Sequence, residues 1–393
     1  MKRILFALSL MAATTASFAQ VAKPMEDVNK VIDNTADSLN KAMTARIQPG
    51  TSRRGNNPVL FLIGNSTMRN GTLGNGNNGQ WGWGYYEHEF FDANKITVEN
   101  QALGGMSSRT FYNRLWPDVR KGIKAGDWVI ISIGHNDNGP YDSGRARASI
   151  PGIGKDSLNV TIKETGVKET VYTYGEYMRK YINDCKALGA HPILMSLTPR
   201  DAYDENDKIV RVNKTFGLWA KQVAEQEHVP FVDLNEISAA KLDSYGHWKE
   251  KYHFFKDHIH TSRFGAMMNA RSAAEGLAES KDPNLAPLQA MMINVALPTE
   301  DFKRESGKPV VFFTGDSTVK NADKDEDGMW GWASQAYTIF NPKKITCVNA
   351  AKAGRSSRSY LNEGRWDKVY NSLLPGDYVL IEFGHNDICS MTD

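Results

Sequence analysis

The chain has 393 residues, of which 41% are hydrophobic, so it is long enough to bury one large core or two ordinary ones. Its 47 basic and 45 acidic residues leave a formal net charge of +2, so the overall charge gives no sign of a nucleic-acid or polyanion footprint. The three cysteines have none of the close spacings that are typical of metal sites or disulfide frameworks. Neutral or modestly charged partners are therefore expected.

The start of the chain has the pattern of a secretory signal. Lys2 and Arg3 precede an apolar run over residues 4–13, and small residues follow it. This run is shorter than the ~20 residues that are needed to cross a bilayer. We therefore predict a cleaved signal peptide over 1–19, a secreted or periplasmic protein without a membrane span, and an N-terminal helix and linker over 20–57.

The segment 58–280 alternates between strand and helix patterns and is predicted to be one domain. Short apolar runs predict strands at 59–63, 96–99, 128–133, 191–196 and 229–233. Helical periodicity is found at 83–91, 175–188, 213–227 and 263–279. This alternation is typical of a three-layer α/β domain with a parallel sheet.

The stretch 139–174 interrupts the alternation. It contains an arginine-rich loop and two short alternating runs, at 159–163 and 168–172, which predict a β-hairpin. Loops of this length are often functional, and this one directly follows a predicted strand. We expect it to border the substrate cleft.

The chain repeats itself at an offset of about 250 residues. Four blocks return: 58–67 as 309–318, 81–83 as 330–332, 100–109 as 349–358, and 126–137 as 376–387. We therefore predict a linker over 281–308 and an incomplete second repeat over 309–393.

A serine and a candidate base occur in the first repeat. Ser66 follows a predicted strand, at the carboxyl end of the sheet where ligands bind in open α/β folds, although a serine there is more often a helix cap. Asp257 and His260 are three residues apart and share one face of a turn, so Asp257 can orient His260 as a base for Ser66. His258 is a competing base, disfavoured because adjacent residues point apart.

Two further residues are candidates for holding an oxyanion. Gly105 lies in a loop after the second predicted strand, where its backbone N–H is accessible, and the side chain of Asn136 follows the third strand. Each residue on its own is also explained as an ordinary turn residue.

Together these blocks resemble the SGNH (GDSL-type) hydrolases, which are named for the order Ser, Gly, Asn, His. Ser66 stands in GNST, Gly105 in GGMSSR, Asn136 in GHND and His260 in DHIHT. The resemblance covers about 58–276 and is greatest to the rhamnogalacturonan acetylesterase branch. It implies a flavodoxin-like α/β/α fold.

The resemblance also implies roles for these residues. Ser66 would attack an acetyl carbonyl, His260 would move the proton, and Asp257 would orient His260. The N–H groups of Ser66 and Gly105, with the Asn136 side chain, would hold the oxyanion. The implied partner is an acetylated plant cell-wall polysaccharide, and no metal or organic cofactor is required, because every reacting group is a protein group.

Other interpretations stay open at this point. Arg109, Arg200 and Trp83 are candidate contacts to sugar rings or galacturonate carboxylates, although core packing or ion pairing also explains them. The ester could instead be acetylated xylan or a lipid, or the domain could be a non-catalytic sugar-binding module.

One position departs from the family pattern. Asn65 stands immediately before Ser66, where these hydrolases usually have aspartate. Because asparagine keeps the shape of aspartate but not its charge, we expect activity to be retained with a different pH dependence.

The second repeat retains Ser317, Gly354 and Asn386 but ends before an equivalent of the Asp-x-x-His block. Without a base it is not expected to be an independent enzyme. Three explanations are a truncated second domain, a half-domain that packs on the first copy, or completion by a partner chain. Truncation is the explanation we favour from the sequence.

Overall fold

The computed structural model describes residues 41, 44–246, 250–251, 253–293, 295, 302, 304, 307–321 and 329–388. The predicted signal peptide and most of the predicted N-terminal helix lie outside the described residues. Within these ranges, no helix is both long and apolar enough to cross a membrane.

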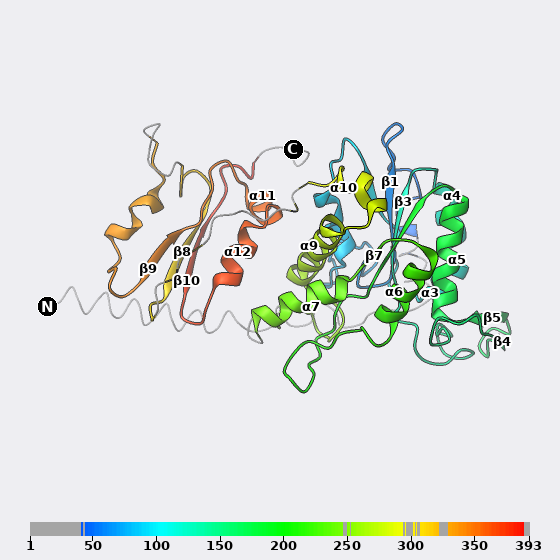
Figure 1. Ribbon diagram of the computed structural model, residues 1–393. Coiled ribbons are helices and arrows are strands. Elements are labelled where there is room, and N and C mark those ends of the chain that lie inside the picture. The colour runs from blue at the N-terminus through cyan, green and yellow to red at the C-terminus, as the bar shows by residue number, and fades with distance from the viewer. Residues whose placement is uncertain are drawn as a thin grey trace.

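A parallel sheet forms the centre of the first domain (Figure 1). Its strands are β1 (Val59–Gly64), β2 (Thr97–Asn100), β3 (Trp128–Ser132), β6 (His191–Met195) and β7 (Phe231–Val232). They pair in the order β2-β1-β3-β6-β7, and every pairing is parallel. All five predicted strands are confirmed, the last with only two residues.

Helices cover both faces of this sheet. One face carries α3 (Ser108–Arg114), α4 (Trp116–Gly122), α5 (Tyr174–Ala187) and α6 (Phe216–Glu227); the other carries η1 (Trp83–Tyr85), η2 (Glu87–Phe90), α7 (Leu234–Tyr245) and α9 (Arg263–Glu279). Along β1, Phe61 and Ile63 enter the first core, and Leu60 and Leu62 enter the second. Because β1 is buried on both faces, its sequence is a continuous apolar run. The three-layer α/β/α prediction is confirmed.

Some local predictions were wrong or incomplete. The predicted helix over 83–91 is two short 3-10 helices, η1 and η2. The helices α3, α4 and α7 were not predicted. Helix α3 begins with a capping box between Ser107 and Thr110 and buries the charged Arg109, so its buried face does not follow an apolar pattern.

The flanking segments are bound to the first domain. Arg53 forms an ion pair of 2.6 Å with the buried Asp127 at the start of β3. After α9, η3 (Pro283–Leu285) and α10 (Ala286–Gln289) place Leu285 and Leu288 in the core. Parts of both predicted linkers therefore belong to the first domain.

The predicted hairpin is present in the insert. Strands β4 (Ser157–Thr161) and β5 (Lys168–Tyr172) pair antiparallel and project from one end of the first domain (Figure 1). Thr173 then caps the N-terminus of α5.

The second unit contains β8 (Val310–Gly315), η4 (Trp332–Thr338), β9 (Thr346–Asn349), α11 (Ser357–Asn362), α12 (Arg365–Ser372) and β10 (Tyr378–Glu382). Its strands pair in the order β10-β8-β9, which matches β3-β1-β2 of the first domain. Individual contacts also match, since the ion pair of Arg304 with Asp377 corresponds to that of Arg53 with Asp127. These correspondences support the prediction of a second repeat.

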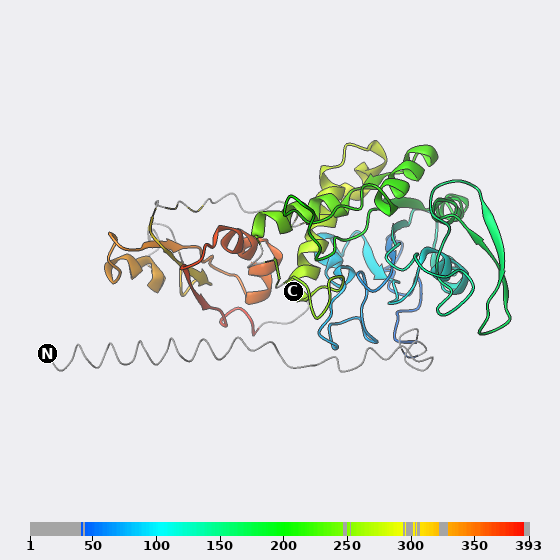
Figure 2. The same cartoon turned by 90° about the horizontal axis from the view of Figure 1, so that it is seen from below.

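The second unit lies against the first domain, with α11 and α12 on the side that faces α7 and α9 (Figures 1 and 2). Arg271 of α9 forms an ion pair of 2.9 Å with Asp367 and donates to the Asn362 carbonyl at 2.7 Å. The rings of Tyr245 and Tyr370 also meet edge to face, with centroids 5.4 Å apart. These contacts agree with the half-domain explanation.

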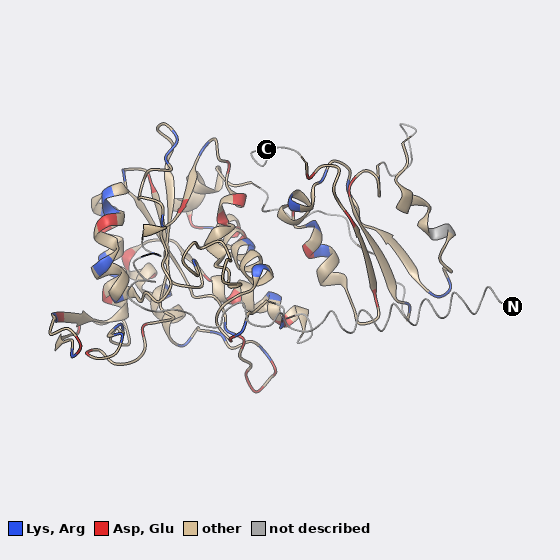
Figure 3. Ribbon diagram, turned by 180° about the vertical axis from the view of Figure 1, so that it is seen from behind, with Lys and Arg blue, Asp and Glu red and all other residues tan. Residues whose placement is uncertain are grey.

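Acidic and basic residues are interspersed along the helices of the first domain (Figure 3). Pairs such as Arg211 with Asp243 and Lys241 with Glu275 join neighbouring elements. This mixture agrees with the small net charge of the chain.

One buried carboxyl group, that of Glu87, has no hydrogen-bond partner among the described residues. Glu87 lies in η2 and is completely buried. Burial raises its pKa well above 4.5. The folded protein therefore keeps a proton on Glu87 at pH values where the unfolded chain has already released it.

Replacing Glu87 with Gln tests this arrangement. The pKa of Glu87 is higher in the folded protein than in the unfolded chain, so wild type loses stability as the pH rises above the unfolded-state pKa. Glutamine does not titrate. Glu87→Gln should therefore change the free energy of unfolding little near pH 4 and increase it relative to wild type near pH 8. Urea unfolding at both pH values measures the difference. Glu225→Gln, at an exposed position of α6, is the control. An equal effect of Glu87→Gln at both pH values would contradict the prediction.

Candidate active site

The turn after β1 presents Ser66 at the carboxyl end of the sheet. The buried Asn65 shapes this turn, because its Oδ1 accepts the Thr67 N–H at 3.0 Å and the Thr67 hydroxyl at 2.9 Å. The Thr67 carbonyl in turn accepts the Trp83 N–H at 3.0 Å. Ser66 itself is half-buried, so its hydroxyl is held in place and still reachable.

His260 and Asp257 meet Ser66 in one line of hydrogen bonds. Nε2 of His260 lies 2.8 Å from Ser66 Oγ, and Nδ1 lies 2.7 Å from Asp257 Oδ2. The other oxygen, Oδ1, accepts the backbone N–H groups of Ile259 and His260 at 2.8 Å each. The structure thus brings together the three residues that the sequence singled out.

The environment keeps Asp257 ionised. Partial burial alone would raise the pKa of its carboxyl group, but the hydrogen bonds from the His260 ring and from two backbone N–H groups outweigh burial and lower that pKa. Gln80 adds a donor, with Nε2 3.2 Å from Asp257 Oδ2 and 3.2 Å from the Phe255 carbonyl. Sequence reasoning missed Gln80, because no local pattern connects it to a residue 177 positions away.

The loop that carries His260 is fixed on both sides. Trp81 and Thr261 exchange two hydrogen bonds, of 2.9 Å and 2.8 Å, and Ser262 then caps α9. His258, the competing base, is exposed, and its carbonyl accepts the Asp201 N–H at 2.9 Å. The geometry therefore selects His260.

Gly105 and Asn136 follow β2 and β3, the two strands that flank β1 in the sheet. Gly105 has φ +81°, a conformation that favours glycine. The loop also passes close to the nucleophile, since a methyl group added to Gly104 would lie 3.6 Å from Ser66 Cβ. Asn136 follows β3, and its Nδ2 donates to the Met106 carbonyl at 2.9 Å. This bond uses one of the two amide hydrogens and ties the glycine loop to the end of β3.

A half-buried histidine next to Asn136, His135, was not predicted. His135 Nε2 lies 3.2 Å from Thr198 Oγ1. Burial, together with the positive charges of Arg200 and His260, lowers the pKa of His135 to about 3. His135 is therefore neutral at ordinary pH. In the second unit the corresponding residue is His385, and its Nδ1 lies 3.6 Å from a carboxylate oxygen of Asp316.

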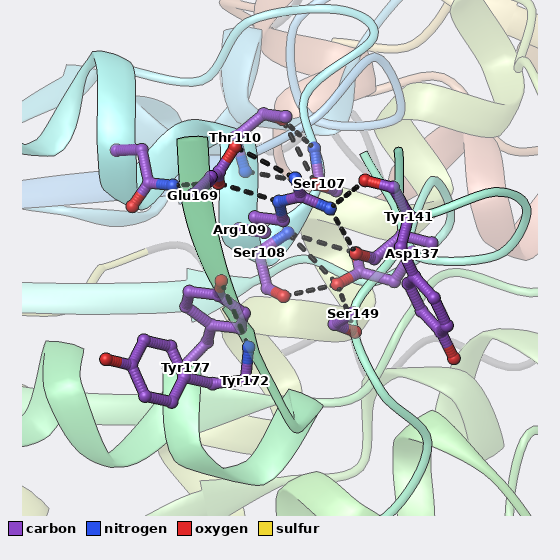
Figure 4. A network of polar contacts seen from close by, with 12 residues as sticks. Ser107, Ser108, Arg109, Thr110, Asp137, Tyr141, Ser149, Glu169, Tyr172 and Tyr177 are labelled. Carbon is purple, nitrogen blue, oxygen red and sulfur yellow. Dashed lines mark hydrogen bonds and ion pairs between the residues drawn. The ribbon is translucent and has the colours of Figure 1, made fainter. Parts of the chain in front are cut away.

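The predicted substrate contact of Arg109 is wrong. Its side chain is completely buried, and Nε and Nη2 bind the carboxylate of Glu169 at 2.7 Å and 2.8 Å. Nη1 donates to the carbonyls of Tyr141 and Ala148 at 2.9 Å and 3.1 Å (Figure 4). Arg109 therefore holds the insert loop in place, and its donors are taken by the protein.

Trp83 is also misassigned, whereas Arg200 stays a candidate. Trp83 is completely buried in the core with residues of α9, because η1 turns its side chain away from the surface. Arg200 is half-buried after β6, and its charge acts on His135.

The comparison with known proteins agrees with this geometry. Residues 60–270 match the model of the GDSL-like lipase/acylhydrolase family. The chain belongs to this family. It is 28% identical to the rhamnogalacturonan acetylesterase of Emericella nidulans, over 54% of this chain and 81% of that one. It is 30% identical to the probable rhamnogalacturonan acetylesterase YesY of Bacillus subtilis, over 56% and 92% of the two chains.

Among solved structures, the acetylxylan esterase Axe2 of Geobacillus stearothermophilus is 25% identical, with a TM-score of 0.39, over 56% of this chain and 93% of that one. Family membership makes the present chain a carboxylic ester hydrolase.

The second unit of this GDSL-like hydrolase has only part of the arrangement. Asn386 Nδ2 donates to the Arg355 carbonyl at 3.2 Å, as Asn136 does to Met106, and Gly354 has φ +75°. Within the described ranges, however, no imidazole is hydrogen-bonded to the Ser317 hydroxyl. The second unit thus repeats the shape of the serine turn without a base.

Asn65→Asp tests the electrostatics of the serine turn. The corresponding Asp316 approaches His385, so an aspartate at position 65 should stabilise a protonated His135 and raise its pKa above about 3. The acid limb of the pH–rate profile for ester hydrolysis should move as well. NMR titration of the imidazole signals and kcat/KM across pH measure both effects. Asn206→Asp, at an exposed loop position, is the control, and an unchanged profile for Asn65→Asp would contradict the idea.

Proposed function

We propose that this chain is a secreted carbohydrate esterase that removes acetyl groups from a pectic polysaccharide, rhamnogalacturonan, by Ser-His-Asp acyl transfer. The observation that carries the proposal is the line of hydrogen bonds from Ser66 through His260 to Asp257, with 2.8 Å and 2.7 Å between the paired atoms. A serine hydroxyl needs such a base, and the base needs such an orienting group, to become a nucleophile at neutral pH.

The first half of the reaction follows from this geometry. His260 Nε2 takes the proton of Ser66 as the hydroxyl oxygen attacks the acetyl carbonyl. Asp257, ionised and bonded to Nδ1, holds the ring with Nε2 toward the serine and stabilises the imidazolium that forms. Gln80 keeps the Asp257 carboxylate oriented.

The tetrahedral intermediate needs donors for its oxyanion. The backbone N–H groups of Ser66 and Gly105 and the Asn136 side chain are the donors at this end of the sheet. Collapse of the intermediate passes the proton from His260 to the leaving sugar oxygen. Water, activated by His260, then attacks the acetyl-enzyme and releases acetate.

The choice of substrate is supported by the relatives. The relatives from Emericella nidulans and Bacillus subtilis described above carry the name rhamnogalacturonan acetylesterase, the second as probable, and this chain covers 81% and 92% of their lengths. The secretory pattern at 1–19 supports export of the enzyme to a compartment where cell-wall polymers are accessible. In the same proposal, the unit over 309–393 has no catalytic role, because no imidazole is hydrogen-bonded to the Ser317 hydroxyl among the residues that the structure describes.

Substituting Ser66 and Ser317 in turn tests which of the two units carries the nucleophile. Ser66→Ala should reduce acetate release from acetylated rhamnogalacturonan by roughly 10³-fold or more, because the nucleophile is lost, whereas Ser317→Ala should leave it unchanged. Release of acetate is measured for both variants and wild type, on this polymer and on acetylated xylan.

The outcomes discriminate between site and substrate. Activity that survives Ser66→Ala would place the nucleophile elsewhere, and loss with Ser317→Ala would place it in the second unit. A preference of the wild type for acetylated xylan would overturn the pectic substrate while leaving the nucleophile intact.

A further inference from the structure

A cavity of about 230 Å³ opens beside the glycine loop. Its walls include Gly105 and Thr110 of the loop and of α3, and three arginines: Arg114 at the end of α3, and Arg145 and Arg147 of the insert loop. No acidic side chain is among the residues that line it. The cavity is thus a strongly basic site in a chain whose net charge is only +2.

The cavity is next to the nucleophile. A methyl group added to Gly104 would lie 3.6 Å from Ser66 Cβ, and one added to Gly105 would lie 3.9 Å from Nη1 of Arg145. Arg147 Nη1 also donates to the Gly105 carbonyl at 3.2 Å. One short loop therefore separates the serine from the arginines, so a sugar unit close to the reacting ester can reach them.

The three positive charges are poorly compensated within the protein. Arg114 and Arg145 are exposed, and neither is in an ion pair within the described part of the chain. Burial, and then the neighbouring charge of Arg145, lowers the pKa of Arg147. Asp137 acts as a counter-charge on Arg147, but it is buried and already accepts hydrogen bonds from Ser108 and from Ser149 at 2.8 Å. Such a cluster is stabilised when an anion enters it.

The insert loop is held rigidly around the cavity. Arg109 binds the loop at the carbonyls of Tyr141 and Ala148, and Asp137 binds it at Ser149 (Figure 4). Arg145 and Arg147 lie between these anchors, which are themselves fixed to α3 and to the end of β3. A site whose donors are fixed beforehand loses less entropy when a ligand binds.

We propose that Arg114, Arg145 and Arg147 form a subsite for the carboxylate of a uronate unit in the substrate. This inference rests on the proposed function and deepens it. The planar guanidinium group matches a carboxylate with two parallel hydrogen bonds, so arginines select an acidic sugar rather than a neutral one. The subsite makes the enzyme prefer acetyl groups near a uronate over acetyl groups on an uncharged chain.

The test compares an acetylated rhamnogalacturonan oligosaccharide with the same oligosaccharide after its carboxyl groups have been reduced to alcohols. Wild type should have a kcat/KM at least about tenfold higher on the acidic form, because hydrogen bonds to a charged group are lost in the reduced form. The double variant Arg114→Gln with Arg145→Gln should abolish this ratio, mainly through KM. Arg54→Gln, an arginine outside the cavity, should keep it.

A second measurement requires no substitution. Deacetylated acidic oligosaccharide should inhibit hydrolysis of 4-nitrophenyl acetate by wild type, and the carboxyl-reduced form should inhibit at least about tenfold more weakly. Equal inhibition by the two forms, or an acidic preference that persists in the double variant, would overturn the subsite. Failure of the proposed function is distinct, since the wild type would then release no acetate from either oligosaccharide.

Discussion

The hydrogen bond between His260 Nε2 and Ser66 Oγ joins residues that are 194 positions apart, and much of the first domain serves to make them meet. Ser66 is placed by β1, a strand buried on both faces, and by the Asn65 side chain, which closes the turn after it. His260 is placed by a loop that is bonded to Trp81 and continued by α9. Because a hydrogen bond of 2.8 Å tolerates little movement, both segments need these independent supports.

Buried polar residues hold the insert loop beside this site in place. Asp137 after β3 and Arg109 in the first turn of α3 bring ionisable side chains into the interior, where each binds backbone or hydroxyl groups of the insert loop. A buried charge is costly unless its hydrogen bonds are satisfied, so these two residues strongly favour one conformation of the loop. That conformation also places Arg145 and Arg147 beside Gly105, so that the supports of the loop also shape the walls of the cavity.

The second unit shows which of these features belong to the scaffold and which belong to the chemistry. It repeats the strand order, the ion pair of an arginine with the aspartate before the third strand, and the bond from the asparagine amide to the glycine loop. It also keeps an aspartate, Asp316, where the first domain has Asn65. What the described residues lack is a base for Ser317, and a shaped serine turn without a base is not a nucleophile.

The strands of the first domain, the recurring sequence blocks and the catalytic candidates could be predicted from local patterns. Buried parallel strands are continuous apolar runs, and Ser66, Gly105, Asn136 and the Asp257–His260 pair lie in short motifs. Three features could not be predicted in this way: the support of Asp257 by Gln80, the burial of Arg109 and Trp83, and the cavity shared by three arginines from two segments. These properties depend on contacts between residues distant in the chain, and burial of a polar side chain leaves no periodic signal. The direction of a side chain is set by packing, which a local pattern does not contain.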